Sequence, residues 1–247
     1  MVLNDVAMIA ADTSRSRVYL QSLIRNDLMP NFVFLLANED DILLPGQVNG
    51  NEVKNKDSVL HINHDSRTEV KNNLSEPVKE TLEKTSIEFE QLRTKNIHDK
   101  DVIKRIQSRS ESVFIYSGYG GVILRKSLFL TKKRFLHVHG GYLPNYKGST
   151  TNYYSLINEN IIGASSIFLN EDIDSGPLLM RKKFKPPKDR KQIDHVYDSE
   201  ARAKVLIETL KTYVQSGLFQ TTENLEAGET YFIIHPVLKH IAILARN

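Results

Sequence analysis

Short apolar runs separated by amphipathic stretches predict alternating strands and helices from the start of the chain. Val6–Ala11 and Phe32–Ala37 are almost wholly apolar, and between them apolar residues from Val18 to Leu28 recur at a nearly helical spacing. Thr13 suits the N-cap of that helix, and Pro30 breaks it. Continuous apolar strands joined through helices are typical of a parallel sheet covered on both faces. The pattern therefore predicts an α/β fold that opens with a β-α-β unit.

The same alternation continues toward the C-terminus. We expect strands over 87–91, 113–116, 135–139, 161–169 and 177–184, and helices over 78–84, 99–108, 122–130, 150–158 and 193–216. Gly140–Gly148 is rich in turn residues and predicts a loop. The tail from Glu229 to Leu244 predicts strand pieces or a turn around Pro236. We therefore expect a catalytic domain over 1–190, followed by a C-terminal helix and tail over 191–247.

One segment of the chain is rich in charged residues, but its net charge is zero. Residues 51–112 contain 12 basic and 12 acidic side chains, which we interpret as a solvated outer layer. Within the domain, the part around 45–75 is expected to be a mobile segment.

Composition excludes several classes of protein. The 247 residues include no cysteine, which excludes disulfides, cysteine-containing zinc sites and thiol nucleophiles. No apolar run approaches the ~18 residues of a membrane span, and Met1–Asp5 lacks the layout of a signal peptide. We therefore expect a cytoplasmic protein that contacts no membrane and holds no metal. With 33 basic and 30 acidic residues, the formal charge of +3 identifies no partner.

The most informative stretch is a histidine pair followed by a Gly-Gly turn. His137 and His139 stand two residues apart on a predicted strand, so their side chains share one face. The turn places them at the carboxyl end of the strand, where open α/β sheets bind ligands. Asp174 lies in a Gly/Pro loop between two later strands and can curve over the same edge. A carboxylate beside an imidazole is a common acid/base pair.

These residues carry a resemblance to a known family. His139-Gly-Gly-Tyr-Leu-Pro144, the later Gly148 and Asp174-Ser-Gly-Pro-Leu178 resemble the core of the 10-formyltetrahydrofolate-dependent formyltransferases over about residues 113–184. The resemblance implies a Rossmann-like formyltransferase fold with a mainly parallel twisted sheet, helices on both faces and a short C-terminal extension. It also implies N10-formyltetrahydrofolate as formyl donor and tetrahydrofolate as product.

The resemblance assigns roles residue by residue. The family's catalytic trio is Asn, His and Asp; His139 and Asp174 match two of them, and His137 stands where Asn is usual. We expect His139 and His137 to donate hydrogen bonds to the formyl oxygen, and Asp174 to hold His139 and help take the proton of the attacking amine. Gly140 in place of Pro, and Ile167 where purine-pathway members often carry His, are further departures. The implied cofactor-binding residues are Ser117, Gly118, Tyr119, Gly120, Gly121, Val122, Leu169, Asp172 and Ile173.

The family offers three acceptors: a purine ribonucleotide amine, aminoacyl-tRNA, or a nucleotide-linked amino sugar. The first βα turn lacks a glycine-rich phosphate loop, which disfavours the purine acceptor. Only about 60 residues follow Lys185, fewer than the ~100 of an added RNA-binding domain, and Arg181–Lys191 is interpreted as a solvated basic loop. We therefore expect no nucleic-acid partner and an amino-sugar acceptor. The stretch 137–155, together with residues 234–240, resembles formyltransferases that act on 4-amino sugar nucleotides of the pseudaminic-acid pathway, which implies such a substrate and a role in surface-glycan biosynthesis. The expected substrate-binding residues are Ser14, Arg15, Arg17, Tyr142, Lys147, Ser149, Thr150 and Tyr154.

Other interpretations stay open on the sequence. A formyltransferase acting on an amino acid or a peptide carrier fits the same donor site. So does a folate-binding protein without transferase activity, because His137 replaces the usual Asn. A fourth alternative is an anion-binding α/β module with a structural histidine pair. The apolar tail, residues 233–244, either closes the core or forms a homodimer contact.

Overall fold

β1 (Val2–Ala11) lies inside a seven-stranded sheet in a computed structural model that describes residues 1–37, 72–223 and 228–245. The strand order is β3-β2-β1-β4-β5-β7-β8. β1 to β5 pair in parallel, whereas β7 is antiparallel to β5 and β8 is antiparallel to β7. The other strands are β2 (Met29–Leu36), β3 (Glu88–Leu92), β4 (Val113–Ser117), β5 (Arg134–His139), β7 (Ile162–Phe168) and β8 (Leu178–Phe184). The predicted α/β class with a mainly parallel sheet is confirmed.

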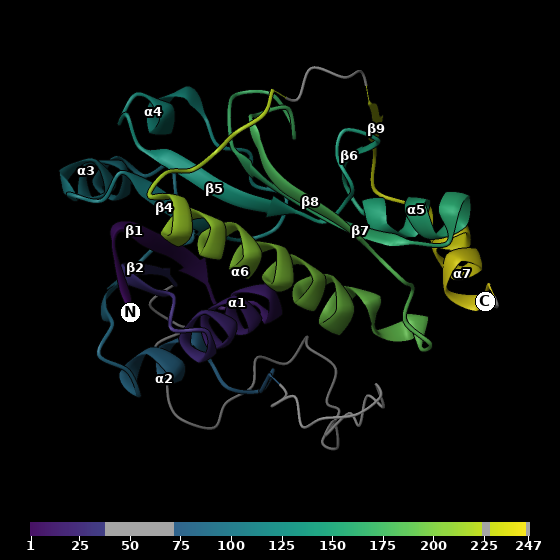
Figure 1. Cartoon of the computed structure of the whole chain (residues 1–247), viewed down its shortest axis with the longest axis horizontal. Helices are drawn as coiled ribbons and strands as arrows, with labels where there is room; N and C mark the ends of the chain where they lie inside the picture. The colour runs from purple at the N-terminus through teal and green to yellow at the C-terminus, as the bar shows by residue number, and fades with distance from the viewer. Residues whose placement is uncertain (38–71, 224–227, 246–247) are drawn as a thin grey trace.

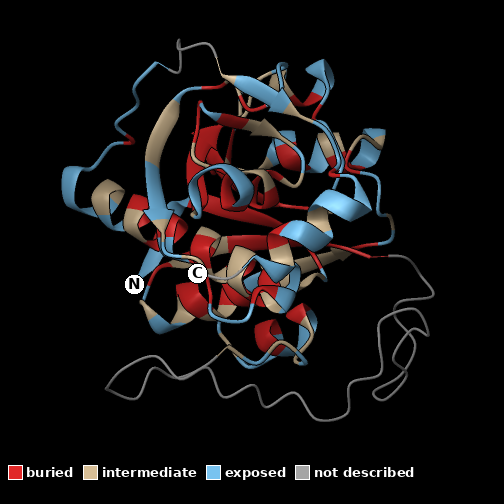
Figure 2. Cartoon of the chain, turned by 90° about the vertical axis from the view of Figure 1, so that its right-hand side faces the viewer, coloured by how far each residue is buried: buried red, intermediate tan, exposed pale blue. Residues whose placement is uncertain are grey.

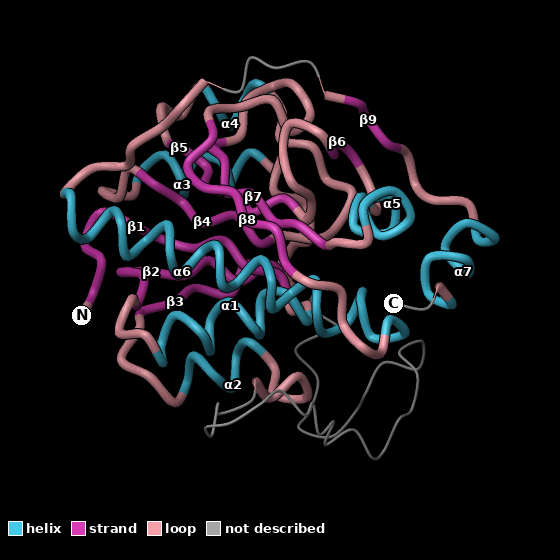
Figure 3. The backbone as a smooth tube through the Cα atoms, turned by 45° about the vertical axis from the view of Figure 1, so that its right-hand side comes forward, coloured by secondary structure: helices cyan, strands magenta, loops and turns pink. Residues whose placement is uncertain are grey.

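Helices cover both faces of this sheet (Figure 1). α1 (Ser14–Arg25), α2 (Val78–Glu83) and α6 (Asp198–Ser216) pack on one face, where their apolar residues join the larger core cluster. α3 (Lys100–Ser108) and α4 (Lys126–Phe129) cover the other face and the smaller core cluster. Figure 3 shows the strands as a layer between these two groups of helices.

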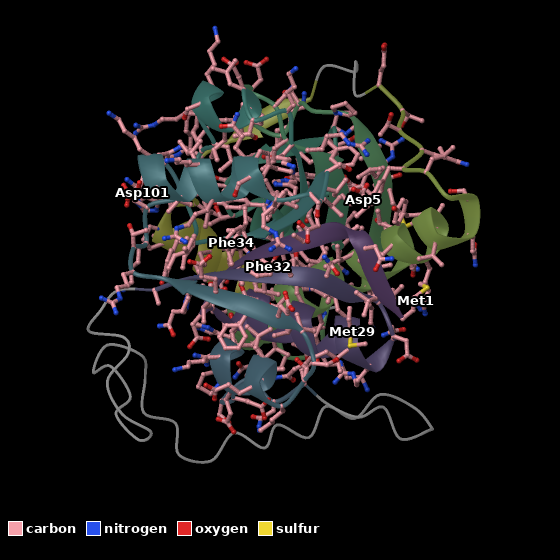
Figure 4. All side chains as sticks on the ribbon, turned by 90° about the vertical axis from the view of Figure 1, so that its left-hand side faces the viewer. Met1, Asp5, Met29, Phe32, Phe34 and Asp101 are labelled. Atoms are coloured by element: carbon pink, nitrogen blue, oxygen red, sulfur yellow. The ribbon has the colours of Figure 1, made fainter. Side chains whose placement is uncertain are left out.

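The apolar strands follow from burial on both faces. Along β4, Val113 and Ile115 belong to the larger cluster, whereas Phe114 and Tyr116 belong to the smaller one. Figure 2 shows the buried residues concentrated in the strands and on the inward sides of the helices. On β2, Phe32 and Phe34 share one face, with ring centroids 4.9 Å apart (Figure 4). A strand buried on both sides has no polar alternation, which is why these runs are continuous in the sequence.

The chain direction places a topological switch point beside β1. From β1 the sheet grows through β2 and β3 to one side, and through β4 and β5 to the other. The carboxyl ends of β1, β4 and β5 therefore meet at one edge, and α1 begins just beyond the end of β1. In open α/β sheets, ligands bind at this kind of edge.

A smaller substructure extends this edge. β6 (Tyr146–Gly148) pairs in parallel with β9 (Glu229–Tyr231), next to α5 (Thr151–Glu159) and α7 (Pro236–Leu244). Two short helical turns, η2 (Arg190–Gln192) and η3 (Ile193–Tyr197), precede α6. Among the described residues, none of the helices is long and apolar enough to cross a membrane.

Three predicted elements differ from the structure. The helix expected over 122–130 is reduced to α4, because Val122 and Ile123 are exposed and have no apolar surface to pack against. The tail beyond Pro236 is the helix α7, since Pro occupies its first turn and the His235 side chain accepts a hydrogen bond from Val237 N. Arg181–Phe184 belongs to β8, as the strand expected over 177–184 predicts, so the solvated loop expected over 181–191 is wrong for these four residues. Most of the segment 45–75 lies outside the described residues.

Candidate active site

The histidine pair lies at the end of β5, where the strand turns into Gly140 and Gly141. His139 is buried, with 5% of its surface exposed, whereas His137 is half-buried. A Cβ added at Gly141 would stand 2.6 Å from both His139 Nε2 and the Tyr146 carbonyl oxygen. The Gly-Gly turn is therefore required by the close approach of the histidine ring to the following loop.

Asp174 approaches His139 from the loop between β7 and β8. His139 Nδ1 and Asp174 Oδ2 are 3.2 Å apart, and the Gly148 N–H donates to the same oxygen at 2.8 Å. Asp174 adopts a φ of 50°, in the left-handed region that a non-glycine residue rarely occupies. Two segments far apart in the sequence thus hold one carboxylate against the imidazole.

Both ring nitrogens of His139 face acceptors. On the side opposite Asp174, Nε2 lies 2.7 Å from the Tyr146 carbonyl oxygen. A neutral ring can donate to only one of these two acceptors, whereas a protonated ring can donate to both. Burial lowers the pKa of His139, and Asp174 opposes that effect. Proton uptake at His139 would therefore complete a hydrogen bond.

Two arginines bring positive charge to the same edge. From α1, Arg15 Nη2 donates to the Gly118 carbonyl oxygen at 2.5 Å, and its Nε donates to Ser117 Oγ at 3.3 Å. From α6, Arg202 Nη1 donates to the Val138 carbonyl oxygen at 2.9 Å. Burial and the charge of Arg202 both lower the pKa of Arg15. Two cations that repel each other at a partly buried position favour an anion between them.

Residues at the start of α6 hold Arg202 in place beside β5. Arg202 Nε lies 2.8 Å from Asp198 Oδ2, and Asp198 Oδ1 accepts a hydrogen bond from Asn152 Nδ2 at 2.9 Å. Asn152 Oδ1 in turn accepts from Gly163 N at 2.8 Å. The Tyr19 hydroxyl is buried nearby without a hydrogen-bond partner among the described residues, and burial raises the pKa of Tyr19 to about 12.

Comparison with known proteins identifies the family. The sequence pattern described as formyl transferase matches residues 7–209. The chain belongs to the formyl transferase family. The family suspected from the sequence is thereby confirmed.

The sequence relatives of this formyl transferase include longer proteins. It is 25% identical over 131 residues to the methionyl-tRNA formyltransferase of Thermodesulfovibrio yellowstonii, a match covering 53% of this chain and 39% of that protein. It is 25% identical over 174 residues to the methionyl-tRNA formyltransferase of Ruminiclostridium cellulolyticum, covering 69% and 54%, respectively. Both matches span well under two thirds of the relatives' own length.

Solved structures share the fold over almost the whole chain. A sugar N-formyltransferase from Shewanella sp. FDAARGOS_354 superposes with a TM-score of 0.60 at 16% identity, covering 98% of this chain and 87% of that one. HypX from Aquifex aeolicus, solved in complex with tetrahydrofolic acid, superposes with a TM-score of 0.56 at 12% identity, covering 95% and 30%. At these identities, the similarity concerns the fold alone.

The expected cofactor-binding residues fall into two groups in this formyl transferase. Ser117 is fully buried and hydrogen-bonded to Ser16 Oγ at 2.8 Å, so its side chain faces α1. Tyr119 donates to the Leu36 carbonyl oxygen at 3.2 Å. Gly118 is buried, and the remaining residues are exposed or partly exposed around the same sheet edge: Gly120, Gly121, Val122, Leu169, Asp172 and Ile173. These form the accessible part of the expected folate site.

The expected substrate-binding residues are less tightly grouped. Arg15 lies at the site, but Arg17 is paired with Asp12 at 2.7 Å and also donates to the Leu74 carbonyl oxygen. Tyr142 lies against Arg181, and Tyr154 packs on Tyr231. Among the others, Ser14 lies in the first turn of α1, Lys147 and Ser149 flank Gly148, and Thr150 lines a cavity of about 400 Å³ beside α7.

Sequence reasoning missed the contribution of α6. Arg202 and Asp198 are four residues apart, a spacing that signals only a common intrahelical ion pair. Nothing local indicates that Arg202 reaches the end of β5, because its partner Val138 lies 64 residues away. Within the described residues, no group of three His, Asp or Glu side chains is placed to hold a metal ion.

Proposed function

We propose that this chain transfers a formyl group from N10-formyltetrahydrofolate to the primary amine of a nucleotide-linked amino sugar. The observation that supports this most is the buried His139–Asp174 pair, which shares one strand edge with the cations Arg15 and Arg202. An acid/base pair beside a cationic edge suits an acceptor that joins a reactive amine to an anionic group.

The formyl donor is a substrate of the reaction, and the loop after β4 has room for it. A Cβ added at Gly120 or Gly121 would meet no atom within 4 Å, so a flat ring can approach the backbone there. Ile173, on the facing loop, is 48% exposed and offers an apolar surface to such a ring. We assign the folate to these two loops, beside Asp174.

The chemistry places distinct demands on the site. The acceptor amine attacks the formyl carbon, a C–N bond forms, and negative charge develops on the formyl oxygen. The positive charges of Arg202 and protonated His139 stabilise that oxygen; one well-placed donor contributes about 2.7–4 kcal/mol. Asp174 keeps His139 oriented and stabilises its protonated form. Collapse then breaks the bond from the formyl carbon to N10 and leaves the formamide on the acceptor.

The cationic edge favours a nucleotide diphosphate on the acceptor. The contacts of Arg15 use Nε and Nη2 and leave Nη1 without a partner among the described residues. Guanidinium groups bind phosphate oxygens with charge-assisted hydrogen bonds. A 4-amino-4,6-dideoxy sugar nucleotide satisfies both the amine and the anion. The sugar N-formyltransferase with the same fold supports a sugar acceptor. We further propose a role in surface-glycan biosynthesis of the pseudaminic-acid type.

A second candidate acceptor is methionyl-tRNA, which is favoured by the sequence relatives. The basic stretch 181–191 is the natural surface for an RNA backbone. However, Lys183 pairs with Glu159 at 2.7 Å, Lys182 pairs with Glu208, and Arg190 is only 4% exposed. Cations already engaged within the protein contribute less to phosphate binding, so we place the sugar nucleotide first.

Arg15 provides the test of this acceptor. Arg15→Ala should raise the KM for a UDP- or dTDP-linked 4-amino sugar by about tenfold or more, since a hydrogen bond to a charged group contributes about 1.5–3 kcal/mol. Arg25→Ala, at the other end of α1 and bonded to Asn72, is the matched control and should leave KM unchanged. Formylation is followed by mass spectrometry, and tetrahydrofolate binding shows whether the donor loop stays intact. Equal KM values in both variants would contradict the assignment.

A further inference from the structure

The His137 ring is held in one orientation by a main-chain acceptor. Its Nδ1 lies 3.3 Å from the carbonyl oxygen of Tyr116, at the point where the pairing of β4 with β5 ends. A carbonyl oxygen only accepts hydrogen bonds, so Nδ1 carries the proton. When the ring is neutral, Nε2 is therefore unprotonated and can only accept.

The surroundings of His137 favour the neutral ring. Arg15 approaches from α1, Arg202 from α6 and His139 from the same strand, while the Tyr116 ring centroid lies 6.2 Å away. Burial, followed by the charges of Arg15 and Arg202, lowers the pKa of His137 well below its usual range. His137 is nevertheless half-buried, whereas His139 is buried.

Building on the proposed function, we infer that Nε2 of His137 carries the proton from the acceptor amine to the departing nitrogen of the folate. As the amine attacks, its nitrogen gains positive charge, and one N–H proton passes to Nε2. The ring is then an imidazolium, with Nδ1 still donating to Tyr116. When the bond to N10 breaks, the same proton passes to N10. The products are the formamide and tetrahydrofolate, and His137 returns to its starting form.

This role differs from the one expected from the sequence. As a hydrogen-bond donor to the formyl oxygen, His137 would need a proton on Nε2, whereas the observed contact with the Tyr116 carbonyl places it on Nδ1. Asparagine, the usual family residue at this position, can donate a hydrogen bond but cannot take up a proton near neutral pH. The two roles therefore give opposite results for His137→Asn.

The ring tautomer is tested without any acceptor. In the full chain with tetrahydrofolate bound, ¹⁵N chemical shifts should show His137 neutral with its proton on Nδ1 at neutral pH. The signal is assigned by its loss in His137→Asn, and His240→Asn, on the exposed side of α7, provides the comparison. A proton on Nε2, or a charged ring, would overturn the inference whatever the acceptor is.

Transfer kinetics complete the test. His137→Asn and His137→Ala should lower kcat by about 10²–10⁴-fold, the usual contribution of a positioned acid/base group. The KM for the acceptor should stay within about twofold, and added imidazole should restore part of the activity of His137→Ala. His240→Asn should behave as wild type. Near-normal kcat in His137→Asn would overturn proton transfer by His137. Absence of transfer to any nucleotide amino sugar by the wild-type chain would instead overturn the proposed function, and with it this step.

Discussion

Two histidines of one strand have different surroundings although their side chains share a face. His139 has an acceptor at each ring nitrogen, Asp174 on one side and the Tyr146 carbonyl on the other. His137 has one acceptor and two nearby arginines. When His139 takes up a proton, its ring therefore forms an additional hydrogen bond. When His137 takes up a proton, the new charge is repelled by the two arginines. Titratable pairs whose surroundings separate their protonation states are a common basis of acid/base chemistry.

The lowered pKa of His137 has a consequence for stability. Because the unfolded chain binds a proton near pH 6.5 and the folded chain binds it only at lower pH, folding stability is complete above that value and falls as the pH drops toward the folded pKa. Each such histidine contributes a slope of at most about 1.4 kcal/mol per pH unit in this window. Urea unfolding across that range should show a steeper acid loss in wild type than in His137→Asn. Equal slopes would mean that the pKa of His137 is not lowered in the folded chain.

At the scale of elements, α6 does more than cover the sheet. Its buried residues, including Leu206 and Leu210, complete the larger core cluster, and its first turn reaches the end of β5 through Arg202. Asp198 holds Arg202 and is itself held by Asn152. The same helix therefore fixes the fold and orients a cation at the site.

Replacing Asp198 should weaken both of these roles. Asp198→Asn removes the anion beside Arg202 but keeps the shape of the side chain, and we expect a stability loss of about 1–3 kcal/mol together with about tenfold weaker kcat/KM. Glu208→Gln, which removes the exposed ion pair with Lys182 on the same helix, is the control and should change stability by less than about 1 kcal/mol. Denaturant unfolding and steady-state transfer measure both. Comparable losses in the two variants would contradict the special position of Asp198.

Helices and strands were predictable from the sequence where the local pattern of apolar residues matches their burial in the fold. β1, β2 and β4 are buried on both faces, so they appear as apolar runs in the sequence, and α1 has a recognisable cap at Thr13. The apolar residues 122–124 mimic a helix but follow Gly121, whose φ is 76°, and two of the three are exposed. In the tail, the apolar run resembles a strand, whereas Pro236 and the His235 cap start a helix.

The candidate site was predictable only in part, because several of its contacts join segments that are far apart in the sequence. The resemblance in the sequence predicted His137, His139 and Asp174 as site residues, and the structure brings the latter two together. The position of Arg202, the pairing of Arg17 with Asp12 and the contact of His137 with the Tyr116 carbonyl depend on which segments meet at the sheet edge. Such long-range contacts have no local signature in the sequence.

At the scale of the whole molecule, segments from both sides of the sheet converge on one edge. α1 and α6, on one face, supply Arg15 and Arg202. The loops after β4 and β7, on the other side, supply the open backbone near Gly120 and the carboxylate of Asp174. In the proposed complex, the acceptor's anionic group lies against Arg15, the folate lies against the loops, and β5 presents its histidines between them.

A competition for labelled formyl groups distinguishes the two candidate acceptors in a single reaction. The chain is mixed with N10-formyltetrahydrofolate carrying ¹³C in the formyl group, together with equal amounts of a nucleotide-linked 4-amino sugar and methionyl-tRNA. We expect the label to appear as the formamide of the sugar, with release of tetrahydrofolate, and His139→Ala and Asp174→Ala to abolish this transfer. Label on the methionyl-tRNA, or label that remains on the folate, would refute formyl transfer to the sugar nucleotide.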